Sequence, residues 1–139
     1  MRILIAALCA ICVLAHADVE AAQPNLCAST VKAEIYARTE LLFGLSRANG
    51  PKITEPEFQN FIDAEVTPRF PDGLTLLTAN GQWQDATGKT IREGSKLLIL
   101  LYPFSEERSR LIEEVRRAYK SSFRQESVLR IDEYSCVSF

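Results

Sequence analysis

The sequence has 139 residues, with 18 acidic side chains against 16 basic ones, a net charge of −2 and a single histidine. This length suits one domain of ordinary size. The near balance of charge argues against nucleic-acid binding, which usually shows a basic surplus on one face, and against binding to an anionic membrane surface.

The first residues have the three parts of a secretory signal peptide. Arg2 precedes an apolar run over residues 3–14, and Ala15-His16-Ala17 is a small-x-small cleavage site. Because the run is shorter than the ~20 residues of a membrane span, we expect cleavage after Ala17, no membrane span and an exported protein, periplasmic or extracellular. We therefore divide the chain into a cleaved signal peptide (1–17), an N-terminal tether (18–33) and a single α+β domain (34–139).

Cleavage would remove His16 together with Cys9 and Cys12. A mature chain without histidine has no Ser-His-Asp triad, no histidine zinc site and no histidine-ligated haem. We accordingly predict neither a metal nor a cofactor. Cys27 and Cys136 remain, and in an exported protein they are predicted to form a disulfide. Two unpaired buried thiols are the alternative.

The first half of the domain predicts one strand and one helix. Strand-favouring and apolar side chains predict the strand over residues 34–46. Thr54-Glu55-Pro56-Glu57 is a capping box that begins a helix over residues 55–66. The helix gives way to a rigid loop at residues 65–74, where two prolines each remove a backbone donor.

The next segment predicts a hairpin. Residues 74–78 suit a strand, and Asn80-Gly81 and Thr87-Gly88 are both turn signals. We expect a bulge or small kink at the first pair and the turn at residues 85–88. The return strand would begin at residues 90–92 and continue into residues 96–102, the strongest strand pattern in the chain.

Ser105 is predicted to cap a second helix, and residues 127–132 are predicted to form the last strand. The order strand, helix, strand, strand, helix, strand predicts an α+β fold of the ferredoxin-like βαββαβ split type. This fold has an antiparallel four-stranded sheet with two helices on one face. Its first and last strands are neighbours, which would bring Cys27 close to Cys136.

Two strands are apolar on both faces. Residues 97–101 and 41–43 show no alternation of apolar with polar side chains, although one face of such a sheet would be free of helices. We therefore expect this helix-free face to be covered. A homodimer is one solution, with Leu42, Leu98 or Leu100 contributing; the other is an apolar cavity under the hairpin and tail.

Six side chains in predicted strands, turns and loops are candidates for a polar site: Glu40, Arg69, Asp72, Trp83, Glu93 and Arg130. Paired carboxylates can divide acid and base roles, but a structural ion pair of Glu40 with Arg69 or Arg130 is the simpler prediction. The predicted function is therefore non-catalytic binding of a small ligand or a protein. The alternative is a histidine-free enzyme of dimeric ferredoxin-like type, using carboxylate and arginine groups near residues 65–74.

Several segments resemble an exported bacterial family catalogued only as a domain of unknown function, family number 3574. They are Thr39-Glu40-Leu41-Leu42-Phe43-Gly44, Thr67-Pro68-Arg69-Phe70-Pro71-Asp72-Gly73-Leu74, Gly81-Gln82-Trp83, Ser95-Lys96, Gln125-Glu126-Ser127-Val128 and Cys136-Val137-Ser138-Phe139. The resemblance implies a small exported protein with no assigned reaction, and it supplies no catalytic residue.

Overall fold

The computed structural model describes residues 27, 32–47, 50–84 and 86–139. The predicted signal peptide and most of the predicted tether lie outside these residues. The described elements are, in chain order, β1 (Glu34–Gly44), α1 (Glu55–Phe61), the π-helical turn η1 (Ile62–Val66), β2 (Thr75–Gln84), β3 (Thr90–Tyr102), α2 (Glu106–Phe123) and β4 (Leu129–Val137).

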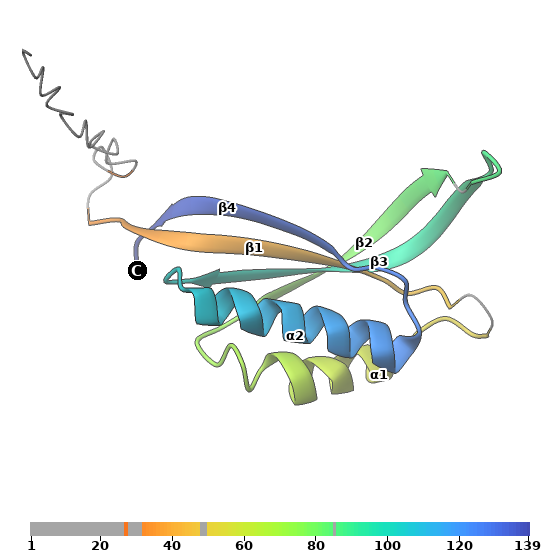
Figure 1. Ribbon diagram of the computed structural model, residues 1–139, viewed down its shortest axis with the longest axis horizontal. Helices are drawn as coiled ribbons and strands as arrows, with labels where there is room; N and C mark the ends of the chain where they lie inside the picture. Colours follow the sequence, from red (N-terminus) through yellow and green to blue (C-terminus); the bar gives the residue numbers. More distant parts are fainter. Residues whose placement is uncertain (1–26, 28–31, 48–49, 85) are drawn as a thin grey trace, which may run out of the picture.

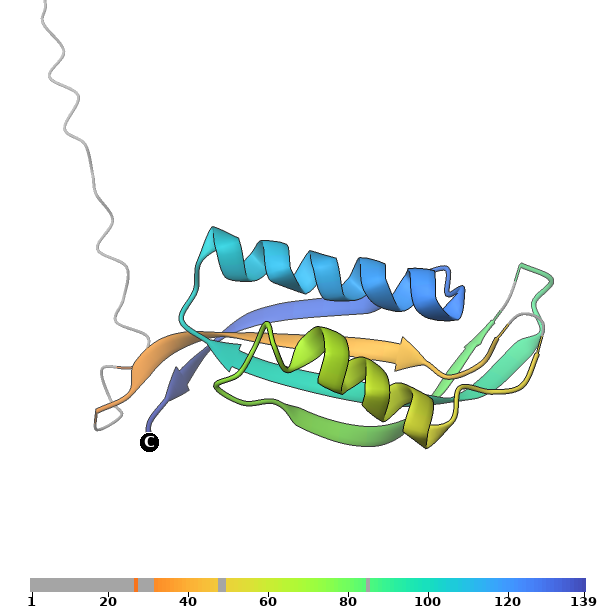
Figure 2. The same ribbon diagram turned by 90° about the horizontal axis from the view of Figure 1, so that it is seen from below.

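The four strands form one antiparallel sheet in the order β2-β3-β1-β4. Both helices lie on the same side of this sheet, as the two views in Figures 1 and 2 show. The predicted α+β class, with a four-stranded antiparallel sheet and two helices, is confirmed. The hairpin of β2 and β3 projects beyond the ends of the helices (Figure 1).

The core lies between the sheet and the helices. Alternate residues of β1 and β3 point into it, among them Leu41, Phe43 and Leu98, each fully buried. The aromatic rings of Phe43 and Tyr119 lie 4.5 Å apart between centroids and join the sheet to α2. Burial raises the pKa of the Tyr119 phenol, whose hydroxyl donates to the Gly44 carbonyl.

The first helix begins as the sequence predicts. The Thr54 side chain accepts from the Glu57 amide, while the Glu57 carboxylate accepts from the Thr54 amide at 2.8 Å. This hydrogen bond and the one from Arg47 lower the pKa of Glu57 to about 2. The helix ends in a wider turn, in which the Thr67 amide donates to the Ile62 carbonyl, immediately before Pro68.

The hairpin is longer than the sequence predicted. β2 and β3 pair without interruption from Thr75 opposite Ile99 to Gln84 opposite Thr90. The predicted bulge at Asn80-Gly81 is therefore wrong, and the predicted end of the strand at Thr78 is too early. The chain turns in the segment between β2 and β3, as expected, where Gly88 has a φ of 80°.

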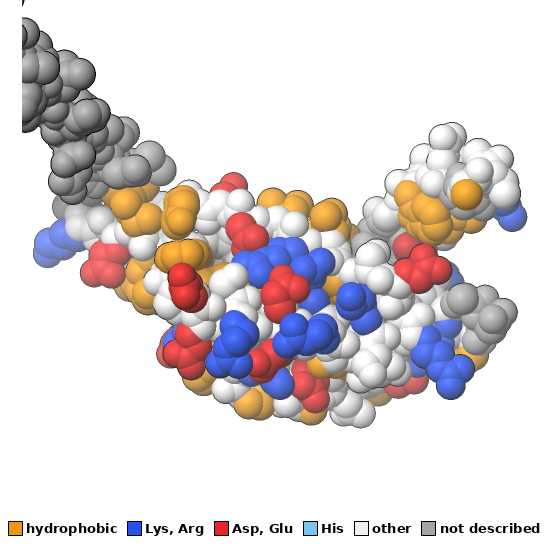
Figure 3. Space-filling view, viewed as in Figure 1, with side chains coloured by type: hydrophobic (Ala, Val, Ile, Leu, Met, Phe, Trp, Pro, Cys, Tyr) orange, Lys and Arg blue, Asp and Glu red, His pale blue; other side chains and the backbone are white. Residues whose placement is uncertain are grey.

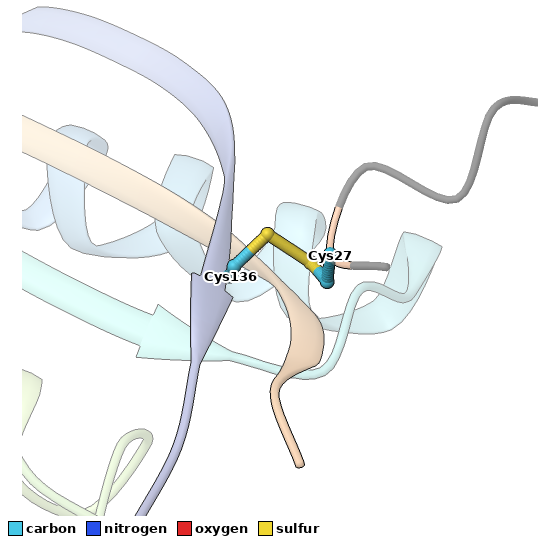
Figure 4. The surroundings of a disulfide bond; sticks show 2 residues. All are labelled: Cys27 and Cys136. Carbon is cyan, nitrogen blue, oxygen red and sulfur yellow. A yellow bond between two sulfur atoms is a disulfide. The ribbon is translucent and has the colours of Figure 1, made fainter. Parts of the chain in front are cut away.

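The last strand extends five residues beyond its predicted end at Asp132, because β4 pairs with β1 as far as Val137 opposite Glu34. Cys136 lies in this extension and forms a disulfide with Cys27 (Figure 4). The C-terminus consequently lies beside the beginning of β1 (Figure 1).

The helix-free face of the sheet is partly apolar. Its exposed large hydrophobic side chains include Leu77, Leu101, Leu129 and Ile131, and the register also places the exposed Trp83 of β2 on this face. The sequence left open whether Leu42, or instead Leu98 or Leu100, points away from the helices. Leu98 and Leu100 point into the core and are fully buried, so of the three only Leu42 lies on the helix-free face. Arg38 lies on the helix-free face, where it pairs with Glu40 and Glu133.

Candidate functional site

A pocket opens where the ends of β1, β3 and β4 meet. Ala37 pairs with Tyr102 on one side and with Tyr134 on the other. Directly opposite side chains share a face, so the small alanine leaves room between two tyrosines. The resulting pocket has a volume of about 200 Å³ and is bordered also by Phe104, Arg130 and backbone or side-chain atoms of residues 132–133.

The rim of the pocket is aromatic and exposed. Phe104 and Tyr134 pack edge to face with ring centroids 6.0 Å apart. Phe104 is 61% exposed and Tyr134 is 60% exposed. Phe104 follows Pro103 in the link between β3 and α2, whereas Tyr134 projects from β4, so two separate elements position the pair.

A hydrogen-bond chain runs under the pocket. The Thr39 hydroxyl donates to Asp132 Oδ1 at 2.6 Å, and it lies 2.6 Å from the Tyr102 hydroxyl. Because threonine has one hydroxyl proton, which goes to the carboxylate, the tyrosine must donate to Thr39. The Tyr102 oxygen is left with acceptor capacity only.

Arg130 connects this chain to α2. Its Nε donates to Asp132 Oδ2 at 2.8 Å, its Nη1 to Glu113 Oε1 at 2.8 Å and its Nη2 to Ser109 Oγ at 3.0 Å. A planar guanidinium with several partners is held more firmly than a lysine would be. Arg130 therefore fixes β4 against α2 at the base of the pocket.

The charges of this network balance one another. Burial opposes ionisation of the Asp132 carboxyl, but hydrogen bonds from Thr39 and Arg130 hold its pKa below the usual value. Burial likewise opposes ionisation of Glu113, whose pKa is lowered by hydrogen bonds from Arg130 and Arg116. Both acids are thus ionised at neutral pH and already paired, which makes them poor general bases.

The six side chains proposed from the sequence do not converge on one site. Of these, only Arg130 borders the aromatic pocket. Glu40 pairs with Arg38 on the helix-free face. The predicted partners of Glu40, which were Arg69 or Arg130, are therefore wrong, because alternate residues of β1 face opposite sides and Arg130 lies on the helix side.

Arg69 and Asp72 hold the loop that follows η1. Arg69 Nη1 donates to the Glu65 carbonyl at 2.6 Å, and its Nε lies 3.4 Å from Glu114 Oε2. Asp72 accepts from Arg108 at 3.4 Å. These contacts connect the loop to the preceding turn and to α2.

Trp83 and Glu93 lie on the projecting hairpin. The indole Nε1 donates to Glu93 Oε1 at 3.3 Å, and Trp83 remains 51% exposed. Trp83 is therefore neither part of the core nor a lining residue of the aromatic pocket. A second, polar hollow of about 490 Å³ lies along the hairpin, with Lys52, Asn80, Gln82, Arg92 and Glu93 among its lining residues.

Most of the residues that form the pocket were not predicted from the sequence. Thr39, Tyr102, Phe104, Asp132 and Tyr134 were not candidates. Thr39 could have indicated the pocket from the sequence, because it is a polar residue at a core-facing position of a predicted strand. In the structure it is completely buried. Its partner on β4 follows only once the register that places Thr39 opposite Asp132 is known.

Three further properties concern the described residues alone. No group of three or more histidine, cysteine, aspartate or glutamate side chains is arranged to hold a metal ion in that part of the chain. No helix there is long and apolar enough to cross a membrane. Every buried side-chain nitrogen or oxygen among those residues has a hydrogen-bond partner.

The fold is similar to that of a phage SAM lyase in complex with S-methyl-5'-thioadenosine. That match has a TM-score of 0.58 and 15% identity, and covers 75% of this chain and 90% of that one. A phage SAM lyase in its apo state matches with a TM-score of 0.52 and 15% identity, over 77% and 92% of the two chains. At this identity the likeness shows a shared fold alone.

Sequence comparison gives the family. No curated protein matches the chain significantly. The model of the family described as "Protein of unknown function (DUF3574)" matches residues 38–139, which is most of the chain and includes the whole pocket except Ala37. The chain therefore belongs to this family of proteins of unknown function.

Proposed function

We propose that this protein is an exported binding domain that holds a small, flat, uncharged molecule in the aromatic pocket. The observation that carries the proposal is the exposed pair Phe104 and Tyr134 above a floor whose polar groups are already satisfied. Exposed aromatic rings retain a large apolar surface that a ligand can bury. The disulfide and the predicted signal peptide support a place outside the cytoplasm.

The size of the pocket favours a ligand of one or two rings. Its volume of about 200 Å³ is below the 300 to 1,000 Å³ range of pockets for drug-sized molecules. A flat ring system would stack on the tyrosine and phenylalanine side chains. A larger molecule would have to leave part of its surface outside.

The electrostatics favour an uncharged ligand. Asp132 and Arg130 are the charged side chains at the floor, and they neutralise each other through two hydrogen bonds from Arg130 Nε. A charged ligand would have to break these contacts or remain unpaired, which costs free energy. The Tyr102 oxygen offers an acceptor, so one hydrogen-bond donor on the ligand would fix its orientation.

Adenine and S-methyl-5'-thioadenosine are suitable first probes. Both are uncharged at neutral pH and combine a flat purine with an amino donor. The second is bound in the phage SAM lyase complex of similar fold, which supports its choice as a probe without assigning that reaction to this chain. The enzyme alternative near residues 65–74 has less support, because Arg69 and Asp72 are both engaged in contacts that hold the loop.

The test is calorimetric titration of the two probes, together with mass spectrometry of small molecules retained by protein purified from its native source. Phe104→Ala and Tyr134→Ala should each weaken binding about tenfold, as the loss of one stacking contact implies. Trp83→Ala removes another aromatic ring that is about half exposed, far along the hairpin, and should leave binding unchanged. Equal affinity in all four proteins, or no bound or retained molecule, would contradict the proposal.

Homodimer formation across the helix-free face is a second candidate role. It is supported by the exposed side chains of Leu77, Leu101, Leu129 and Ile131. Figure 3 shows hydrophobic side chains along the upper edge of the molecule, on the side of the sheet away from the helices, and on the hairpin. The ion pairs of Arg38 weigh against a flat face-to-face contact, since burying them removes three charges from water.

A further inference from the structure

The edge of the sheet formed by β2 lacks the usual protection against pairing with another strand. Natural edge strands are short, or contain charged residues or proline, because their outer backbone groups are unpaired. β2 has ten residues, Thr-Leu-Leu-Thr-Ala-Asn-Gly-Gln-Trp-Gln, with neither a charged residue nor a proline. Within the described part of the chain it pairs with β3 alone.

The residues of β2 also complement themselves. If two copies of β2 run antiparallel with the twofold axis at Asn80, each residue lies opposite one of the same parity, as a shared face requires. Leu77 of each copy then lies opposite Trp83 of the other, and Ala79 lies opposite Gly81. Large apolar side chains meet large ones, and small residues meet small ones.

Neighbouring registers lose this match. With the axis at Ala79, Trp83 would lie opposite Thr75 and Leu77 opposite Gly81. With the axis at Gly81, Trp83 would lie opposite Ala79. The Asn80 register is therefore the one of these three that buries both exposed apolar side chains of β2, which are 48% exposed at Leu77 and 51% at Trp83.

The absence of charge on β2 and the hydrogen bond of Trp83 favour the same pairing. Two identical strands face each other without like charges, because β2 has none. The Trp83 indole already donates to Glu93 at 3.3 Å, which reduces the side-chain freedom that association would remove. The strand runs along the outside of the sheet and into the projecting hairpin (Figures 1 and 2).

We propose that a second copy of this chain pairs with β2 in antiparallel orientation, with the twofold axis at Asn80. The two sheets become one eight-stranded sheet, in which residues 76–84 of each copy form the new ladder. The aromatic pockets, which lie at the β4 side, remain open at opposite ends. This contact is separate from the ligand proposal and from a face-to-face dimer.

A cross-linking experiment tests the register in the full chain with Cys9 and Cys12 replaced by serine. A single Asn80→Cys variant should form an intermolecular disulfide on mild copper-catalysed air oxidation, because the two thiols meet at the axis. Gln82→Cys is the matched control on the same strand. Its counterpart lies four residues away along the ladder, about 14 Å, which is beyond the reach of a disulfide.

Light scattering completes the test. Wild-type protein should be a dimer, Asn80→Lys should be a monomer because two lysines would face each other, and Leu129→Glu should remain a dimer. A monomeric wild type at all concentrations overturns the proposal, as does cross-linking of Gln82→Cys as readily as Asn80→Cys. Conversion of Leu129→Glu to a monomer would assign the contact to the helix-free face instead.

Discussion

The two edges of the sheet are built in opposite ways. β4 contains Arg130, Asp132 and Glu133 and ends in a disulfide at Cys136. β2 has no charge, no proline and no covalent attachment along its ten residues. Among the described residues both edge strands have outer backbone groups without a strand partner, but β4 contains charged side chains that discourage pairing with another strand, whereas β2 contains none.

This difference indicates a division of roles. Side chains of β4 connect to β1 through Asp132 and to α2 through Arg130, and the pocket forms against this fixed frame. The hydrogen bonds of β2 side chains run mainly within the hairpin, as in the contacts of Gln82 with Arg92 and of Trp83 with Glu93. Changes at β4 should therefore cost stability, while changes at β2 should cost association.

Removal of the disulfide should have the largest effect. The bond joins residues 109 positions apart, and a closure of this length is worth about 5 kcal/mol in the chain-entropy model. Replacing both Cys27 and Cys136 by serine should lower the free energy of unfolding by about this amount in urea titration. Asn80→Lys is the matched change at the other edge, and it should alter the free energy of unfolding of the monomer by less than about 0.5 kcal/mol. A similar loss in both variants would contradict the division of roles.

Arg130→Met should have the next largest effect. The side chain is 16% exposed and has three partners on two elements, so its loss should cost about 2 to 3 kcal/mol. Arg92→Met on the hairpin removes an arginine that bonds to the exposed Gln82 and should cost less than about 0.5 kcal/mol. Thermal melts of the two variants measure the difference, and equal melting temperatures would refute it.

Acid should weaken the β4 side through Asp132 and Glu113, in addition to its effect on the Glu57 cap of α1. Because the folded-state pKa values of Asp132 and Glu113 are lowered, the stability that these groups contribute is fully present above their ordinary values of 3.8 and 4.5 and is lost as the pH falls through the lowered values. The Asp132 carboxylate is 49% exposed, and screening by water should limit its share to under about 1 kcal/mol. Unfolding titrations at pH 7 and pH 3 should show that the free energy of unfolding falls less between these two pH values in Asp132→Asn than in the wild type. An unchanged loss of stability at pH 3 in Asp132→Asn would contradict this assignment.

The sequence was sufficient for most of the fold, because local signals set its elements. The element order followed from local signals, which are the capping box at Thr54, the cap at Ser105 and the apolar strands. The positions of Cys27 and Cys136 before the first strand and near the end of the chain agreed with a fold in which the first and last strands are neighbours. The ends of the strands were less predictable. β4 continues to Val137 because β1 pairs with it there, and no local residue signals that contact.

The candidate site depended on information that local patterns do not contain. The pocket exists because register places Ala37 between Tyr102 and Tyr134, which lie far apart in sequence. Arg69 and Glu40 looked costly in isolation but found partners nearby in the chain, Glu65 and Arg38. Long-range register therefore decided which polar residues formed the site.

Hydrogen–deuterium exchange at two protein concentrations tests the contrast between the edges most directly. Peptides covering β2 (Thr75–Gln84) and β4 (Leu129–Val137) would be followed in the same sample. Exchange in the β2 peptide should slow as the protein concentration rises, because a second chain pairs with its outer backbone groups, while exchange in the β4 peptide should not change. Exchange in β2 that is independent of concentration, or equal slowing at both edges, would contradict this prediction.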